Sequence, residues 1–505
     1  MTRQPSPQQA AIYDFVTQGK GSGLVIAVAG AGKTTTLTGV CARIPARESV
    51  AFCAYNKGIA TEIAAKLLEA GVGANVKSGT FHSFGFGALA QALKVKLQVD
   101  DKKCQKIAVA MRCPDGLLPF VTKLVSLAKQ RAVNVLTVPG DDAAWYGIVD
   151  HFGLTDTLSE ASDPDAVGTG VMIAKAVLAK SNELIRTGAV DFDDMIYGPL
   201  VLDVRMWQRD WVLVDEAQDT NPARRALARK MLKPNGRLIA VGDPHQAIYG
   251  FTGADSDALE LIKAEFGCAE YPLTVTYRCP KAVVALAQTW VSHIQAAESA
   301  PDGVVKFMDR KEFRGTTPGA EDVILCRLTK PLVEQAYEYI GRGVGCRVEG
   351  RDIGAGLVKV IDKVCGKAGC LSVAAFLDKL DAYQDRETQR LLAKGQETAA
   401  EAVDDRCATL RVIAGQLPDE SPVAGIKAAI QSLFGDTPDG ERARVLTLST
   451  VHKAKGREWD RVYLLGRDRY MPSKWARQAW QQEQEVNLMY VAVTRARCEL
   501  VEVEG

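Results

Sequence analysis

Short apolar runs that end in polar, glycine-containing turns recur along the chain. The first run, LVIAVAG at residues 24–30, is rich in β-branched residues and leads through GKTTT into a helical pattern. WVLV at 211–214 and RLIAV at 237–241 repeat an apolar run followed by a polar turn. Runs of this length between turn signals are typical of buried strands. Because such strands alternate with helical stretches at 24–83 and 211–275, we predict a parallel sheet with helices on both faces.

A second set of strand-like runs follows residue 275. It consists of DVILCRL at 322–328, VLTLSTV at 445–451, RVYLLG at 461–466 and CELVEVE at 498–504. The stretches at 104–187 and 349–440 are helical in pattern and contain no such run. The sequence therefore predicts an α/β protein with two sheet domains, each with a mostly helical insertion. The expected boundaries are 1–103 and 188–275 for the first domain, 104–187 for its insertion, 276–348 and 441–505 for the second domain, and 349–440 for a second, short insertion.

Composition narrows the classes of protein to consider. The 505 residues are too many for a single core, and 47% hydrophobic with 24% charged residues is ordinary for a globular chain. Lys and Arg number 62 against 61 Asp and Glu, which excludes a strongly basic protein but not a local basic groove. The 12 cysteines are scattered without a CxxC pair, so we expect no zinc site and a reducing compartment. With no apolar signal region or run of 18 apolar residues, we expect a soluble, cytoplasmic protein without a membrane partner.

The turn after the first strand has the residue types that bind nucleotide phosphates. Gly30 and Gly32 permit a tight loop whose backbone N–H groups can face phosphates. Lys33 would reach the β- and γ-phosphates, and the Thr34 hydroxyl would bind Mg²⁺. The alternative is a glycine-rich turn with an incidental lysine, and Ala27 stands where the common pattern opens with glycine. The candidate nucleotide-binding residues of this loop are Ala29, Gly30, Ala31, Gly32, Lys33, Thr34 and Thr35.

Acidic residues follow the strand at 211–214. The carboxyl ends of parallel strands face the ligand crevice, so Asp215 could hold Mg²⁺ and Glu216 could orient or deprotonate a water. The alternative is an acidic turn that caps the next helix. Gln246, after the next strand, is placed to sense the γ-phosphate or its water. Glu216 favours hydrolysis over phosphoryl transfer, since a kinase has no need to activate water.

Six segments occur in one order along the chain. They are AGAGKTT at 29–35, DEAQD at 215–219, GDPHQAIYGF at 242–251, TYR at 276–278, STVHKAKGREWD at 449–460 and NLMYVAVTRAR at 487–497. Together they resemble the superfamily 1 DNA helicases of the UvrD/Rep type, over nearly the whole chain apart from the two helical insertions. The resemblance implies two RecA-like P-loop NTPase domains that bind ATP and Mg²⁺ between them.

The resemblance also implies roles for residues that the pattern alone does not explain. Arg495 would be an arginine finger that stabilises charge on the γ-phosphoryl group, worth roughly 10³–10⁵ in rate. Arg278 would lie at the junction of the two domains. Arg497 is interpreted as helix-end charge, with a phosphate contact as the alternative. The catalytic candidates are thus Lys33, Glu216, Gln246, Arg278 and Arg495, and the further nucleotide contacts are Gln9 (or Gln8) and Tyr277 for adenine and Glu458 for ribose.

The same resemblance implies a track for single-stranded DNA through both domains. Tyr249 and Phe251 lie in a glycine-containing turn and suit base stacking, although core packing is the usual role of such residues. DFDDM at 191–195 is expected to be structural, or a contact on the DNA side. Three of the five histidines lie in the motifs and no pair has metal-ligand spacing, so DNA or polar contacts are favoured over zinc. The DNA-binding candidates are Asn56, Thr80, Phe81, His82, Phe84, Tyr249, Phe251, Thr450 and His452.

Two residues depart from the pattern of the family. Thr252 stands where arginine usually follows the aromatic segment, which places the linking role of that arginine in doubt. Arg457 stands where an apolar residue is usual, and we interpret it as solvent-exposed, with a phosphate contact as the alternative.

The sequence as a whole predicts an ATP-dependent helicase or translocase. Its partners would be single-stranded and tailed duplex DNA, with 3′→5′ movement implied by the resemblance, and a protein could bind through the helical insertions. RNA is the less favoured track. Translocation without unwinding, and a nucleotide-gated DNA-binding switch, are the alternative hypotheses. A small-molecule kinase is disfavoured because Arg278 and Arg495 would then have no role.

Overall fold

The computed structural model describes most of the chain. The described residues are 4–69, 71–72, 75–154, 158, 165–248, 250, 255, 257–366, 369–392, 397–434, 445–474, 476 and 478–505. Contacts divide the chain into two compact units, residues 1–273 and 274–505. Among the helices of the described part, none combines the length and the apolar character that a bilayer crossing requires.

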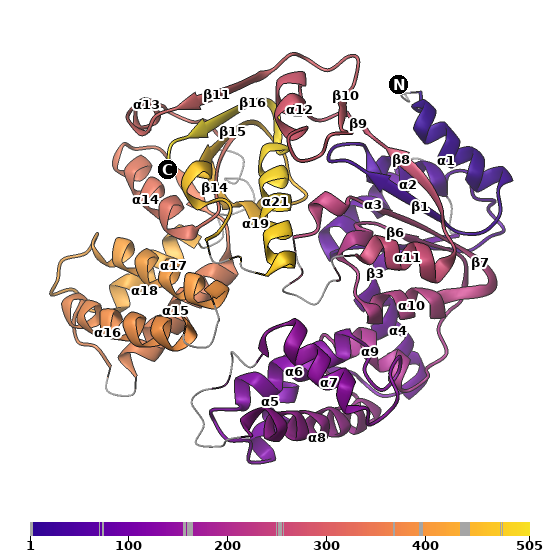
Figure 1. The fold of residues 1–505 in the computed structure, drawn as a ribbon, viewed down its shortest axis with the longest axis horizontal. Helices are drawn as coiled ribbons and strands as arrows, with labels where there is room; N and C mark the ends of the chain where they lie inside the picture. The colour runs from indigo at the N-terminus through magenta and orange to yellow at the C-terminus, as the bar shows by residue number, and fades with distance from the viewer. Residues whose placement is uncertain are drawn as a thin grey trace. The chain divides into compact units, whose positions relative to one another are not determined.

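The first unit is built on a six-stranded sheet in which all neighbouring strands are parallel (Figure 1). The strand order is β3-β2-β6-β7-β1-β8. The strands are β1 (Gly23–Ala27), β2 (Val50–Ala54), β3 (Val76–Thr80), β6 (Arg209–Val214), β7 (Leu232–Gly242) and β8 (Ala269–Leu273). The helices that flank this sheet are α1 (Pro7–Gln18), α2 (Lys33–Cys41), α3 (Lys57–Glu69), α4 (Phe81–Leu93), α9 (Asp194–Val201), α10 (Pro222–Met231) and α11 (Ala258–Phe266). The α/β class predicted from the apolar runs is confirmed.

The strand order brings the polar turns together. β7 lies between β1 and β6, and its Ile239 is in register with Gly23 of β1 and Leu213 of β6. The three strands are therefore aligned, and the turns that follow them lie side by side at the carboxyl edge of the sheet. Every side chain of β2 is buried, as expected for an inner strand covered on both faces.

Four helices between residues 103 and 186 form the insertion in the first unit. They are α5 (Lys103–Ala110), α6 (Leu118–Gln130), α7 (Asp142–His151) and α8 (Ala166–Arg186), and a two-stranded sheet of β4 (Gln98–Val99) and β5 (Ala189–Val190) lies at their ends. Figure 1 shows the four helices gathered together. Phe120, Trp145 and Val177 belong to a core of their own, separate from the core around the sheet. The predicted insertion is thus a helical body with its own hydrophobic core.

A buried ionic network joins this insertion to the segment DFDDM. Lys129 Nζ lies 2.5 Å from Asp191 Oδ2 and 2.7 Å from Asp194 Oδ1. Lys103 Nζ lies 2.7 Å from Asp194 Oδ2 and donates to the Ser181 carbonyl at 2.9 Å. Burial disfavours the Lys129 ammonium, but the charges of Asp194 and Asp191 outweigh burial and raise its pKa. These contacts support the structural interpretation of DFDDM.

We expect Lys129→Met to destabilise the first unit by about 3–5 kcal/mol, because Asp191 and Asp194 would stay buried with one cation fewer. The free energy of unfolding can be measured by urea titration followed through tryptophan fluorescence. Lys180→Met is a matched control, since the ion pair of Lys180 with Glu183 is exposed and should contribute less than about 1 kcal/mol. Equal losses in the two variants would contradict a stabilising role for the buried network.

The second unit has its own six-stranded parallel sheet, of order β11-β16-β15-β12-β14-β13. Its strands are β11 (Val304–Met308), β12 (Asp322–Cys326), β13 (Cys346–Val348), β14 (Leu446–Thr450), β15 (Trp459–Leu465) and β16 (Ala496–Val503). A separate two-stranded sheet pairs β9 (Val275–Thr276) with β10 (Gln295–Ala296). The helices around the large sheet are α12 (Lys281–Ala287), α13 (Arg310–Gly315), α14 (Thr329–Gly341), α19 (Val451–Ala454), α20 (Arg467–Tyr470) and α21 (Ala479–Val493).

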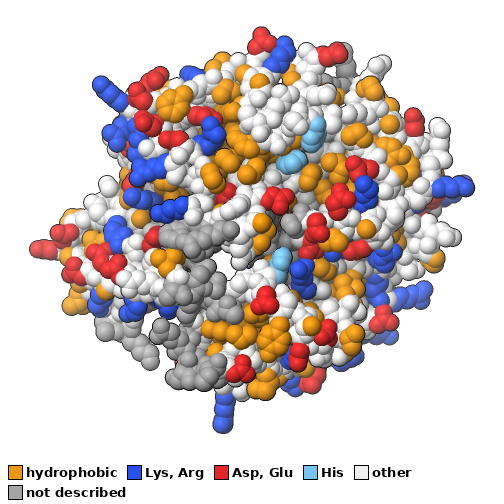
Figure 2. All heavy atoms as spheres, in the orientation of Figure 1, with side chains coloured by type: hydrophobic (Ala, Val, Ile, Leu, Met, Phe, Trp, Pro, Cys, Tyr) orange, Lys and Arg blue, Asp and Glu red, His pale blue; other side chains and the backbone are white. Residues whose placement is uncertain are grey.

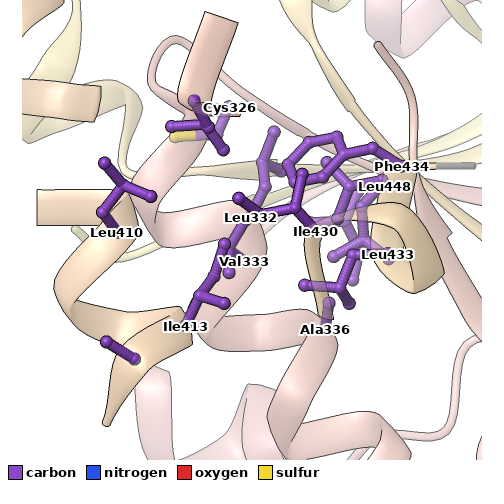
Figure 3. Close-up of a cluster of buried hydrophobic side chains, with 14 of the residues drawn as sticks. Cys326, Leu332, Val333, Ala336, Leu410, Ile413, Ile430, Leu433, Phe434 and Leu448 are labelled. Carbon is purple, nitrogen blue, oxygen red and sulfur yellow. The ribbon is translucent and has the colours of Figure 1, made fainter. Parts of the chain in front are cut away.

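The helices inserted in the second unit share their core with its sheet. They are α15 (Arg351–Cys365), α16 (Val373–Leu392), α17 (Glu397–Ala414) and α18 (Ala424–Phe434). Figure 3 shows Leu448 of β14 beside Leu433 and Phe434 of α18, with α14 in the same cluster. Asp405 of α17 also accepts hydrogen bonds at 2.9 Å from the backbone N–H groups of Thr329 and Lys330. The two insertions therefore differ, because the first packs as a separate body and the second is continuous with its domain.

The surface carries charges of both signs. On the face shown in Figure 2, Lys and Arg side chains are interspersed with Asp and Glu. This mixture agrees with the net charge of +1. Attraction for a polyanion would therefore depend on local groups, and not on the charge of the whole chain.

Candidate functional site

The loop between β1 and α2 has the shape of a phosphate cradle. Gly30 and Gly32 have φ values of +72° and +80°, which side chains with a Cβ rarely adopt. Gly32 ends the loop, and α2 starts at Lys33, with the N–H of Thr36 donating to the Gly32 carbonyl at 2.8 Å. The first N–H groups of a helix have no carbonyl partner within it, and they attract anions. Ala29 and Ala31 are buried, so only their backbone could face a ligand.

The turns after β1 and β6 meet directly. Lys33 Nζ lies 3.1 Å from Glu216 Oε2, with about a tenth of the lysine side chain exposed. The Thr34 hydroxyl donates to Asp215 Oδ2 at 3.3 Å. These four residues are the candidates for the phosphates, the metal and the water, and the fold of the first unit brings them together. Thr35 follows them on α2, and no hydrogen bond joins its side chain to this group in the part of the chain that the structure describes.

Burial changes the acid–base properties of these side chains. Burial, reinforced by the charge of Glu216, raises the pKa of Asp215 to about 6, although Lys33 opposes the shift. Burial disfavours the Lys33 ammonium, but Glu216, Asp243 and Asp215 outweigh it and raise the pKa of Lys33. The Lys33 ammonium thus faces the carboxylates of Glu216, Asp243 and Asp215. Hard oxygen donors are the ligands that Mg²⁺ prefers, so the Asp215 carboxylate and Thr34 hydroxyl fit this ion.

Glu216 is held in an unusual backbone conformation. Its φ of +50° and ψ of +47° place a residue with a bulky side chain in the left-handed region. Such conformations cost about 1–3 kcal/mol and are frequent at active sites. The turn aims the carboxylate at Lys33. It also begins the short 3₁₀ helix Ala217–Asp219.

Gln218 and Gly242 complete the site, although no local sequence signal indicates their roles. The Gln218 amide donates to Glu216 Oε2, and its Oε1 accepts the backbone N–H of Asp243 at 3.0 Å. Gln218 thereby joins the turns after β6 and β7. A Cβ at Gly242 would lie 2.8 Å from Gln218 Oε1, so only glycine allows this approach. Because the link depends on strand order, nothing in the local sequence indicated it.

The two predicted glutamines are both placed near this group. Gln246 is buried, and its Nε2 donates to Asp243 Oδ2 at 2.6 Å. Gln9 takes part in a capping box with Ser6 at the start of α1, and its Nε2 donates to the Thr36 hydroxyl at 3.1 Å. Gln9 is therefore fixed against the helix that follows the phosphate loop. Its assignment to adenine stays a prediction.

The predicted nucleotide-binding residues of the second unit contact one another and their own backbone. Arg278 Nε is paired with Glu458 Oε2, and its Nη1 donates to the Thr494 carbonyl at 3.4 Å. Arg495 is 1% exposed, and its guanidinium donates to the carbonyls of Val491 and Arg457 and to the Thr494 hydroxyl, at 2.8, 3.2 and 3.0 Å. The proposed finger is thus held within its own unit. Tyr277 is 37% exposed beside Arg278.

The structure contradicts the interpretation of Arg497 and confirms that of Arg457. Arg497 does not end a helix: it lies in strand β16, where Nη2 is 2.9 Å from Asp460 Oδ1. Arg457 is exposed as expected, with 42% of its side chain accessible, and it also pairs with Glu349 and lies 4.7 Å from the centre of the Trp459 ring. The partners of both arginines come from other strands and loops, so the local sequence does not indicate these pairs.

Two of the aromatic DNA candidates belong to the core. Phe81 and Phe84 on α4 are 6% and 5% exposed and lie in the hydrophobic core of the first sheet. Bases cannot stack on rings that are covered by other side chains, so these two assignments are corrected to core packing. Thr80 and Asn56 accept backbone N–H groups at 3.1 and 2.9 Å near the starts of α4 and α3. Their DNA roles stay predictions.

The two histidines of the predicted DNA track are neutral. Burial, with the charge of Arg224, lowers the pKa of His82 to about 4. Burial, with the charges of Arg327 and Lys453, lowers the pKa of His452 to about 3. Both would therefore contact DNA by hydrogen bonding and not by charge. Thr450, at the end of β14, is 7% exposed. The remaining candidates, Tyr249 and Phe251, lie outside the described residues, as does Thr252.

Comparison with protein families agrees with the site. Residues 7–130 and 159–267 match the model of the UvrD/REP helicase N-terminal domain. Residues 427–502 match the model of the UvrD-like helicase C-terminal domain. Together the two models match more than half of the chain. The N-terminal match contains both the phosphate loop and the carboxylates that face it.

Individual relatives extend this similarity. The chain is 25% identical over 501 residues to "F-box DNA helicase 1" of Gallus gallus, covering 94% of this chain and 46% of that protein. It is 25% identical over 364 residues to "DNA helicase IV" of Escherichia coli, covering 65% and 53%. It is 24% identical over 322 residues to "Probable DNA helicase II homolog" of Mycoplasma pneumoniae, covering 58% and 43%. The chain thus spans about half the length of the curated relatives it matches.

Proposed function

The chain belongs to the UvrD-like helicase family, and from this membership we propose that it is an ATP-dependent DNA helicase that moves along single-stranded DNA. The observation that carries the proposal is the meeting of Lys33 with Glu216 and of Thr34 with Asp215 at the edge of one parallel sheet. A cation, a hydroxyl and two carboxylates in this arrangement suit a nucleoside triphosphate and its hydrolysis. The names of the relatives support DNA as the polymer.

Each residue of the first unit has a part in the proposed reaction. Lys33 would neutralise charge on the β- and γ-phosphates, and the loop at 29–32 would donate backbone N–H groups to them. Glu216 would accept a proton from the attacking water, and Gln218 would hold its carboxylate in place. Thr34 and Asp215 would hold Mg²⁺, which neutralises phosphate charge when it is bound.

The proposed roles in the second unit follow the family. Arg495 would stabilise the charge that develops on the γ-phosphoryl group, and Arg278 would support it. Tyr277 would stack on adenine, and Glu458 would contact the ribose. Movement in the 3′→5′ direction and unwinding of tailed duplexes are part of the proposal. So is a cytoplasmic location, where reducing conditions would keep the free cysteines as thiols.

Steady-state ATP hydrolysis tests this function most directly. We expect activity to be low without nucleic acid and strongly stimulated by single-stranded DNA. Lys33→Ala should lower the stimulated rate by roughly 10²–10³-fold, because the carboxylates of Asp215, Glu216 and Asp243 would then face the phosphates without a cation. Lys20→Ala, a change in the loop before β1, is the matched control and should leave the rate unaltered.

Three outcomes would contradict the proposal. Stimulation by single-stranded RNA alone would change the polymer. Activity that ignores both polymers would remove the motor function. Hydrolysis of one ATP per binding event on long strands would indicate a nucleotide-gated switch. Displacement of a strand from tailed duplexes then separates unwinding from translocation alone.

A further inference from the structure

Arg224 differs from Arg225 and Arg229, the other arginines of α10, in its contacts. Arg225 pairs with Asp255 and Glu265, and Arg229 lies over the Phe266 ring at 4.3 Å. Arg224 is half-buried, yet no carboxylate in the described part of the chain lies within ion-pairing distance of its guanidinium. Among the described residues, its side chain makes one hydrogen bond, from Nη1 to the Asp219 carbonyl at 2.7 Å. A guanidinium has five donors, so most of its capacity remains for a ligand.

Arg224 lines two cavities at the carboxyl edge of the first sheet. The larger has a volume of about 180 Å³, and its lining includes Tyr55, His82, Gln130 and Asn221. The smaller, of about 10 Å³, is lined by Tyr55, His82 and Arg224 together with Asp215 and Glu216. Arg224 thus lies between an open cavity and the two carboxylates of the ATP site.

The larger cavity has polar groups that suit a nucleotide. The Gln130 Oε1 atom is buried and has no hydrogen-bond partner in the described structure, so it can accept from a ligand. Asp193 also lines the cavity, but its carboxylate already accepts from Ser126 and from Gln130, at 2.6 and 3.2 Å. The ring of Tyr55 lies 5.7 Å from the Arg224 guanidinium. A nucleotide would bring phosphate oxygens for Arg224 and base N–H groups for Gln130.

A direct path leads from Arg224 to the catalytic turn. Its partner carbonyl belongs to Asp219, the last residue of the 3₁₀ helix that begins after Glu216. The Asp219 N–H in turn donates to the Glu216 carbonyl at 3.0 Å. Anything that shifts the Arg224 guanidinium therefore acts on the turn that aims Glu216. The left-handed backbone of Glu216 makes this aim dependent on the contacts around the turn.

We propose that Arg224 binds a backbone phosphate of the single strand and, through the Asp219 carbonyl, positions Glu216 for hydrolysis. Arg224 is a positioning residue, since Glu216 and not Arg224 would touch the reacting water. The inference rests on the proposed helicase function. It adds to that function a residue that reports strand occupancy to the ATP site.

Binding of a fluorescein-labelled oligodeoxythymidylate at several salt concentrations tests the phosphate contact. Each phosphate contact contributes about 0.7 to the slope of log K against log salt for a single strand. We expect Arg224→Gln to reduce the slope by about 0.7, and Arg229→Gln, the matched control on α10, to leave it unchanged. An unchanged slope in Arg224→Gln would overturn the inference alone, whereas a wild-type chain that fails to bind the strand would overturn the helicase proposal as well.

The positioning role needs a separate measurement. At saturating single-stranded DNA, Arg224→Gln should show at least roughly tenfold less stimulation of ATP hydrolysis than the wild type. Arg224→Lys keeps the charge but has no planar fork, so it should restore the salt slope without restoring stimulation. Full stimulation in Arg224→Lys would overturn the claim that one guanidinium contacts both the strand and the Asp219 carbonyl.

Discussion

Arg495→Ala should lower kcat for DNA-stimulated ATP hydrolysis by roughly 10³-fold or more. A guanidinium at the γ-phosphoryl group stabilises charge that exists only in the transition state, and its loss in other nucleotide hydrolases costs this much. The measurement is the steady-state rate at saturating MgATP and single-stranded DNA. Arg495→Lys should lose most of this activity too, because an ammonium cannot reproduce the fork of donors.

Arg495 also has structural contacts, so its substitution needs controls for folding. The Arg495 guanidinium also binds the carbonyls of Val491 and Arg457. Circular dichroism and the thermal midpoint must therefore show that the second unit is still folded. Arg497→Gln serves as the neighbouring comparison, because the pair of Arg497 with Asp460 is exposed and should change the rate by less than about twofold. Equal losses at 495 and 497 would remove the special role of Arg495.

Glu216→Gln should lower kcat by roughly 10²–10⁴-fold while the protein still binds the nucleotide. An amide has the shape of the carboxylate but cannot accept the proton of the attacking water. Lys33 and the loop at 29–32 are unchanged in this variant, so binding should persist. Hydrolysis by quench-flow and affinity for a fluorescent ATP analogue separate the two effects.

Substitution of Glu270 is the matched control for Glu216→Gln. Glu270→Gln removes an acid of the same unit whose pair with Lys263 is exposed, and it should leave hydrolysis unaltered. If Glu216→Gln hydrolysed ATP at the wild-type rate, Glu216 would have no role as a base. The Glu216 carboxylate would then serve only as the ion-pair partner of Lys33.

Much of the fold could be predicted from the sequence because parallel strands bury both faces. The run before Lys33 and the run before Asp215 are apolar without alternation, and both are strands of one sheet. The resemblance to a known family then assigned the polar turns. The contact of Lys33 with Glu216 spans more than 180 residues of sequence, but both ends carry recognisable signals.

What could not be predicted depends on neighbours from distant segments. Phe81 and Phe84 were DNA-contact candidates through the resemblance, and only the packing of α4 shows that they are core. Lys129 is buried against Asp191 and Asp194, more than 60 residues away in the sequence. Gln218 acquires its role from the order of β6 and β7. Side chains like these are defined by tertiary contacts, which no local pattern contains.

The left-handed backbone at Glu216 sets stability against activity at one position. Glycine would adopt the same φ and ψ without steric cost, and would relieve about 1 kcal/mol or more of backbone strain. It would also remove the only group proposed to activate water. A search for heat-resistant variants would therefore favour inactive proteins at this site. Natural selection for turnover has to maintain a strained residue there, against substitutions that would relieve the strain.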